Sequence, residues 1–105
     1  MKLGSNDKRY PILITGRELK ELQRFSWQMV EAFGLDRRIE NYRGTRPIGL
    51  YRWDMECLID VIDMALVDPK EYPRQTGPGY EAMKTLCERL KQLKDQAYSE
   101  LGLQR

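Results

Sequence analysis

The residues best suited to chemistry lie in segment 37–53, where arginines alternate with aromatic side chains. Five arginines stand against one acid, Glu40, so the segment carries a local charge of about +4. A guanidinium is a planar fork that suits phosphate or carboxylate and stacks on rings or bases. The segment therefore predicts contact with single-stranded nucleic acid or a phosphorylated ligand. The residues expected to make that contact are Arg37, Arg38, Arg43, Arg46, Arg52 and Trp53.

The same arginines have a structural interpretation, which the sequence favours. The helix expected next carries the acids Asp54, Glu56, Asp60, Asp63 and Asp68. A basic loop beside an acidic helix would form internal ion pairs, and stacking of arginine on tryptophan commonly orders a loop. The net charge of +2 is also modest for a dedicated DNA-binding domain. Nucleic acid is thus a possible but weakly supported partner.

Three carboxylates of that helix, Glu56, Asp60 and Asp63, are spaced by four and three residues and fall near one helical face. Such a group suits a hard cation or acid–base catalysis. The chain has no histidine, however, which excludes a serine–histidine or cysteine–histidine mechanism within it. A solvated acidic face is the favoured interpretation. We predict no catalytic residue, no cofactor and no metal, and regard a carboxylate- or metal-dependent enzyme as the second alternative function.

The elements that must position these residues are mainly helices. Apolar residues recurring at three and four residues predict a helix at about 16–33, capped by Thr15 with Glu18 in capping-box spacing and ended by Gly34. A short helix follows from Leu35 to Arg43, with Asp36 as its expected cap. A second long helix at 52–67 stops at Asp68-Pro69, and a third begins near Pro78 and ends near Gly102.

The apolar stretch 10–14 contains Pro11 and predicts an extended arm or an edge strand. Ile48 to Tyr51 is the one other strand candidate, so we do not expect a sheet. Residues 1–9 are predicted to be a flexible segment and residues 10–105 a single helical domain. The predicted fold is all-α, a small helical bundle of three long amphipathic helices and one short helix, with an extended N-terminal arm.

Two features point to a protein partner. The last helix carries Met83, Leu86, Leu90 and Leu93 at heptad-like spacing, which suits either the core of one chain or an interface between two. Trp27 lies away from the apolar stripe of the first helix, and burial under a neighbouring segment is favoured over an exposed partner anchor. As function we predict a non-enzymatic interaction or assembly module, self-associating through the last helix, with ligand binding by segment 37–53 as the alternative.

Composition adds a cellular context. No apolar run is long enough for a membrane span, and the polar N-terminus does not resemble a signal peptide. We therefore expect no membrane association and a cytoplasmic protein. Cys57 and Cys87 lie inside helical patterns and are expected to be reduced thiols at helix interfaces.

Overall fold

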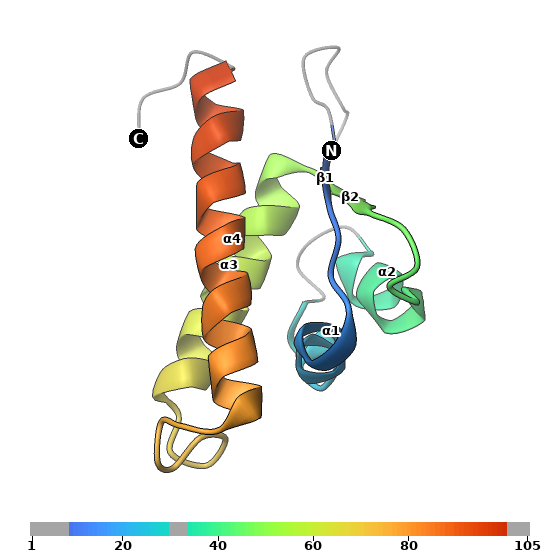
Figure 1. The fold of residues 1–105 in the computed structure, drawn as a ribbon. Coiled ribbons are helices and arrows are strands. Elements are labelled where there is room, and N and C mark those ends of the chain that lie inside the picture. Colours follow the sequence, from blue (N-terminus) through green and yellow to red (C-terminus); the bar gives the residue numbers. More distant parts are fainter. Residues whose placement is uncertain (1–8, 30–33, 101–105) are drawn as a thin grey trace.

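The computed structural model describes residues 9–29 and 34–100 (Figure 1). Helices make up most of this part, which confirms the predicted class in its general form. In chain order the elements are β1 (Tyr10–Ile12), α1 (Gly16–Gln23), the 3-10 helix η1 (Ser26–Gln28), α2 (Leu35–Asn41), β2 (Ile48–Leu50), α3 (Arg52–Val67) and α4 (Pro78–Glu100).

The pair α3 and α4 forms the long side of the molecule, where the two helices run beside each other (Figure 1). The predicted bounds 52–67 are confirmed, and so is the start of the last helix at Pro78. Their apolar stripes supply side chains with no exposed surface, because each stripe covers the other and the elements behind it. These are Met55, Leu58, Ile62, Met83, Leu86 and Leu90.

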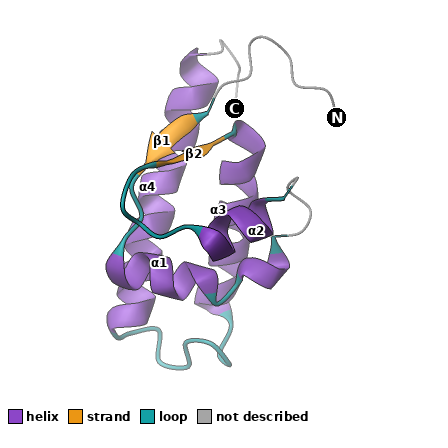
Figure 2. Cartoon of the chain, turned by 90° about the vertical axis from the view of Figure 1, so that its right-hand side faces the viewer, coloured by secondary structure: helices purple, strands orange, loops and turns teal. Residues whose placement is uncertain are grey.

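Helix α1 lies across this pair (Figure 2) and closes the core from another side. Thr15 is its N-cap, as predicted, but its side chain makes no capping hydrogen bond. Glu18 is turned instead toward Arg89 of α4, whose Nη1 lies 2.5 Å from the carboxylate. The prediction of a capping box is therefore wrong, because Glu18 forms an ion pair with Arg89 of another helix.

The predicted helix 16–33 is too long. Helix α1 ends at Gln23, and the backbone then tightens, with the N–H of Phe25 donating to Leu22 O at 3.0 Å. This turn lets both Phe25 and Met29 reach the core. Gly34 is left-handed as expected, with φ of +84°, but it precedes α2 and replaces Asp36 as the cap. Residues 30–33 lie outside the described part.

A two-stranded sheet forms where none was expected. Strands β1 and β2 are antiparallel, with Tyr10 opposite Leu50 and Ile12 opposite Ile48. Alternate residues of the arm, Tyr10, Ile12 and Ile14, are buried, so pairing with β2 gives their backbone partners while their side chains join the core. The prediction of an extended arm is confirmed, whereas the expectation of no sheet is wrong.

The remaining predictions about segments have mixed outcomes. Cys57 and Cys87 are free thiols, as expected. No helix in the described residues is both long and apolar enough to cross a membrane. The flexibility predicted for residues 1–9 concerns a segment that, apart from Arg9, lies outside the described residues.

Candidate functional site

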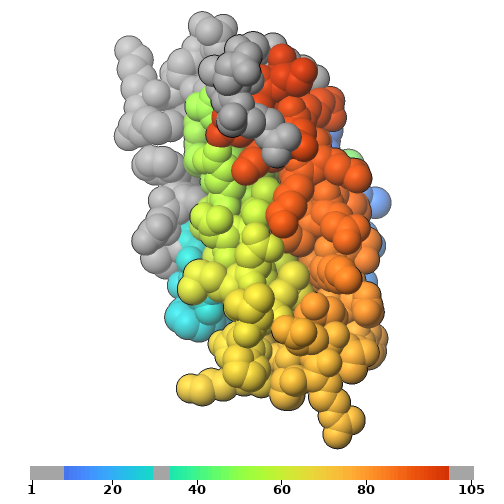
Figure 3. Space-filling view, turned by 90° about the vertical axis from the view of Figure 1, so that its left-hand side faces the viewer, coloured from blue at the N-terminus to red at the C-terminus, as the bar shows by residue number. Residues whose placement is uncertain are grey.

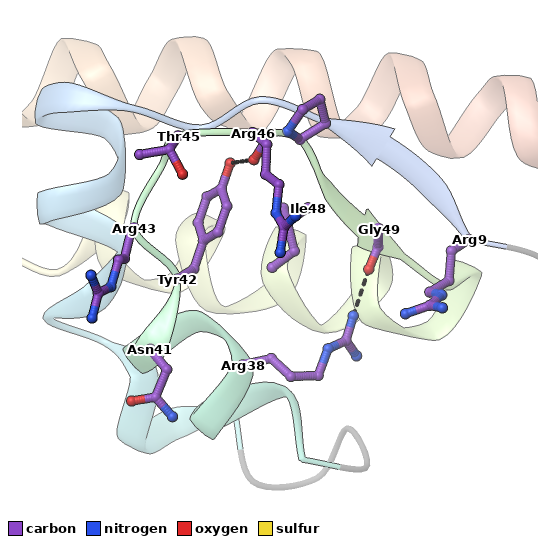
Figure 4. A pocket seen from close by; sticks show the side chains of 10 residues that line it. Arg9, Arg38, Asn41, Tyr42, Arg43, Thr45, Arg46, Ile48 and Gly49 are labelled. Atoms are coloured by element: carbon purple, nitrogen blue, oxygen red, sulfur yellow. Dashed lines mark hydrogen bonds between the residues drawn. The ribbon is translucent and has the colours of Figure 1, made fainter.

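A basic pocket of about 390 Å³ lies between α2, the connection 42–47 and the paired strands (Figure 4). We call it the arginine pocket. Its walls come from segments far apart in the sequence, which the β1–β2 pairing brings together. The residues that line it are Arg9, Arg38, Asn41, Tyr42, Arg43, Thr45, Arg46, Pro47, Ile48 and Gly49.

Arg38 is the structural member of the arginine pocket. Its Nη1 lies 2.9 Å from Oδ2 of Asp54, and its Nη2 donates to the carbonyl of Gly49 at 2.6 Å. Asp54 is completely buried, and the same Oδ2 accepts the backbone N–H of Tyr51 at 2.9 Å. Arg38 thereby joins α2 to β2 and to the start of α3. Arg38 therefore forms an internal ion pair of the kind expected for the basic segment.

Tyr42 holds the connection that carries the other arginines. Its hydroxyl donates to the carbonyl of Arg46 at 2.6 Å and accepts the backbone N–H of Ile14 at 3.4 Å (Figure 4). Gln23 of α1 donates from Nε2 to the carbonyl of Tyr42 at 2.9 Å and to that of Ile39 at 3.1 Å. Carbonyls at the end of α2 therefore receive a partner from another helix.

Gly44 allows this connection to approach the arm. Its φ is +73°, and a Cβ there would lie 3.0 Å from both Ile14 O and Leu19 Cδ2. Only glycine combines this backbone conformation with such close approach. The loop is thus fixed by packing at Gly44 and by hydrogen bonds at Tyr42.

Arg9, Arg43 and Arg46 supply the unneutralised charge of the pocket. All three are exposed, and none forms an ion pair with a carboxylate in the described part of the chain. Figure 4 shows Arg46 reaching down between Tyr42 and Gly49, and Arg9 at the strand edge. Arg43 lies on the far side of Tyr42 and points away from the other two. Arg9 also sits over the ring of Tyr51, at 5.9 Å from its centroid.

The structure divides the six predicted contact residues into two groups. Arg38, Arg43 and Arg46 line the arginine pocket. The other three do not. Arg37 is exposed on α2, Arg52 lies over the ring of Tyr98 at 5.7 Å, and Trp53 stacks on Tyr51 with centroids 4.7 Å apart.

Sequence reasoning missed Arg9 and the polar residues Asn41, Tyr42 and Thr45. Arg9 falls in the segment predicted to be flexible, although the alternation that starts at Tyr10 indicates which way its side chain points. If Tyr10 and Ile12 face the core, the side chain of the residue before them points to the opposite face of the strand. The partner strand, and hence the pocket, needed the tertiary structure.

The predicted partner residues also separate. Met83, Leu86 and Leu90 have no exposed surface within the single chain, and Leu93 is half-buried. A second chain cannot touch the first three while the fold is closed, so self-association through this seam is not supported as predicted. Trp27, in contrast, is 70% exposed, which overturns the favoured interpretation that it is buried.

The three carboxylates considered for catalysis have separate surroundings. Glu56 accepts a hydrogen bond from the Tyr98 hydroxyl. Asp63 accepts one from Cys87 Sγ at 3.4 Å and lies 3.6 Å from Lys91 Nζ. Asp60 is exposed. Within residues 9–29 and 34–100, no group of three or more acidic, cysteine or histidine side chains could hold a metal ion.

Comparison of the chain with protein-family models, with curated proteins and with solved structures found no match.

Proposed function

We propose that the protein is a non-enzymatic binding module whose arginine pocket holds a phosphate-bearing ligand, with single-stranded nucleic acid as the leading class. One observation carries the proposal: among the described residues, four arginines line the pocket and no carboxylate does. Three of the four, Arg9, Arg43 and Arg46, have no ion pair with a described acid. Their charge is therefore available to an anion.

The framework around these arginines also favours binding. Arg38 and Tyr42 hold the backbone of the pocket through hydrogen bonds of 2.6 Å to Gly49 O and Arg46 O. A wall that is already ordered loses less conformational entropy when a ligand arrives. Asn41 and Thr45 add uncharged polar groups that can complete the hydrogen bonds of a phosphate. The ligand would meet charge on a rigid wall.

The modest net charge of +2 fits a local site better than a long basic track. We expect a few phosphate contacts, and hence weak affinity that falls as salt rises. For single strands, each neutralised phosphate changes the logarithm of affinity by about −0.7 per logarithm of salt concentration. Two or three contacts therefore predict a slope between about −1.4 and −2.1.

The test is fluorescence anisotropy with a short labelled single-stranded oligonucleotide at several salt concentrations. Arg46→Ala should weaken binding roughly ten- to a hundredfold, because a charge-assisted hydrogen bond contributes about 1.5–3 kcal/mol. Arg9→Ala should weaken it by a similar factor. Arg43→Ala should have a smaller effect, because that side chain points away from the other two (Figure 4).

Arg74→Ala is the matched control. Arg74 is an exposed arginine in the connection between α3 and α4, outside the pocket, so its loss removes the same charge. Affinity should be nearly unchanged in this variant. Equal weakening by Arg74→Ala and Arg46→Ala would mean diffuse attraction and would contradict the proposal. If the wild type does not bind the oligonucleotide at low salt, nucleic acid is excluded as the ligand class. If inorganic pyrophosphate does not compete with a bound oligonucleotide, recognition of phosphate by the pocket is excluded.

Two predictions about context belong to the same proposal. We infer a reducing compartment, the cytoplasm, for this binding, supported by the free thiols of Cys57 and Cys87. Self-association stays a prediction: of the residues predicted to contact a partner, Trp27 is exposed and Leu93 is half-buried, so both are accessible.

A further inference from the structure

Arg9 connects the arginine pocket to a pair of stacked aromatic rings. Its guanidinium carbon lies over the ring of Tyr51, 5.9 Å from the ring centroid. Tyr51 in turn stacks on Trp53, with ring centroids 4.7 Å apart and planes inclined by 13°. We call Arg9, Tyr51 and Trp53 the stacked row. Arg9 is the member of the row that lines the arginine pocket.

The pairing of the two strands assembles the stacked row. Tyr10 lies opposite Leu50, so the residues next to them along the chain, Arg9 and Tyr51, are also brought side by side. Trp53 lies in the first turn of α3. The start of α3, in light green, is at the upper end of the face shown in Figure 3, and the strands lie at the same end of the molecule in Figure 1.

Gly49 lets the aliphatic stem of Arg9 pack closely on β2. A Cβ at Gly49 would lie 3.0 Å from Cβ of Arg9 and 3.2 Å from its Cδ, so a larger residue would push the stem away. Tyr51 supports the guanidinium at the end of that stem. Arg9 is exposed, and Figure 4 shows its guanidinium turned toward the middle of the pocket. The side chain is therefore positioned by packing while its charge faces the site.

A positioned guanidinium offers a ligand a flat face as well as hydrogen-bond donors. Unpaired nucleobases stack on arginine and on aromatic rings, and they do so with little preference for sequence. Arg9 and Arg46 line the same pocket of about 390 Å³. A phosphate beside Arg46 and a base against Arg9 would therefore occupy neighbouring parts of one site. A ligand with phosphate alone would leave the flat face of Arg9 unused.

We propose that Arg9 holds an unpaired base of the ligand, which stacks on the guanidinium and extends the stacked row into the pocket. This inference rests on the proposed function, because it names what lies next to the phosphate. It narrows the ligand from phosphate-bearing compounds in general to single-stranded nucleic acid. Tyr51, Trp53 and Gly49 are positioning residues, which act on the base through Arg9.

The experiment compares two labelled strands of equal length by fluorescence anisotropy at low salt. One is an oligodeoxyadenylate, and the other is a strand of stable abasic units with the same phosphates. The wild type should bind the adenylate strand roughly fivefold or more tightly than the abasic strand, because a stacked base contributes at least that much. The ratio of the two affinities measures the contribution of the base.

Arg9→Lys keeps the charge and removes the flat face. It should weaken binding of the adenylate strand roughly fivefold and leave binding of the abasic strand nearly unchanged. Arg46→Lys is the matched control, and it should change both affinities by the same factor. Tyr51→Leu removes the ring beside Arg9 and should lower the preference for the adenylate strand, whereas Tyr51→Phe keeps the ring and the preference. Thermal melting of each variant checks that the fold is retained.

The outcomes separate this inference from the proposed function. Equal affinity of the wild type for the two strands would overturn base stacking and leave phosphate binding by the arginine pocket intact. Equal weakening of both strands by Arg9→Lys would overturn it in the same way, whatever the Tyr51 variants do. If neither strand binds the wild type, the proposed function fails and base stacking fails with it.

Discussion

The α3–α4 pair and the arginine pocket are built on opposite physical principles. The helical pair is held by apolar side chains with no exposed surface, such as Leu58, Met83 and Leu90. The pocket is held by directional hydrogen bonds of a few side chains, above all Arg38 and Tyr42. Apolar burial is non-directional and consumes surface. A polar framework fixes backbone and leaves charge facing solvent, which is what a binding site requires.

The largest expected effect is in the helical pair. Leu90→Ala should lower the free energy of unfolding by about 2–5 kcal/mol, because it leaves a cavity in the core. Urea denaturation followed by circular dichroism measures this loss. Leu93→Ala on the same helix is the matched control, and its half-buried position predicts a loss of about 1 kcal/mol. Equal losses for the two variants would mean that Leu90 is not a core residue.

The next effect is in the polar framework. Arg38→Ala would leave the buried Asp54 carboxylate without its guanidinium, whose Nη1 lies 2.9 Å away. Breaking a buried ion pair costs about 3–5 kcal/mol, and the partial exposure of Arg38 reduces this to roughly 2–4 kcal/mol. Arg37→Ala removes the same charge from an exposed site on α2 and should change stability little. An equal fall of the denaturation midpoint in Arg38→Ala and Arg37→Ala would contradict the structural role of Arg38.

A smaller effect links the framework to binding. Tyr42→Phe removes the hydrogen bond to the carbonyl of Arg46 and should lower stability by about 1 kcal/mol. The same change should weaken oligonucleotide binding several-fold, because the loop that carries Arg46 loses a constraint. Anisotropy and thermal melting on one sample measure both. Tyr80→Phe, outside the arginine pocket, should leave binding unchanged.

The smallest effect at neutral pH concerns a polar contact inside the helical pair. Burial, helped by a hydrogen bond to Asp63, raises the pKa of the Cys87 thiol from 9.0 to about 11. The unfolded chain therefore loses this proton before the folded chain does. The stabilisation is complete below pH 9 and is lost as pH rises toward 11.

Urea midpoints across this range measure the decline. Cys87→Ala should make it shallower without abolishing it, because burial also raises the pKa of Tyr72, which hydrogen-bonds to Glu21. Cys57→Ala should leave the decline as steep as in the wild type. An unchanged slope in Cys87→Ala would exclude this thiol as its cause.

Local signals in the sequence determined several parts of this protein. The apolar period, with Pro69 and Pro78 as stop and start, predicted both bounds of α3 and the start of α4. The end predicted for the last helix, near Gly102, lies outside the described residues. The position of Thr15, directly before the first apolar period, also predicted the N-cap of α1. Such features depend on neighbours within a few residues, so a single sequence contains them.

Tertiary structure alone decided what covers each apolar face and where each charge points. Periodicity predicts that Leu90 lies on the apolar face of its helix, but it does not say whether the same chain or another chain packs against that face. The structure shows that Leu90 is buried within its own chain. The helix predicted through Trp27 ends at Gln23, and the turn that follows lets Phe25 and Met29 reach the core. Arg9 reached the pocket through a strand pairing that joins Tyr10 to Leu50. Contacts between such distant residues depend on the free energy of the whole fold, and no local pattern encodes them.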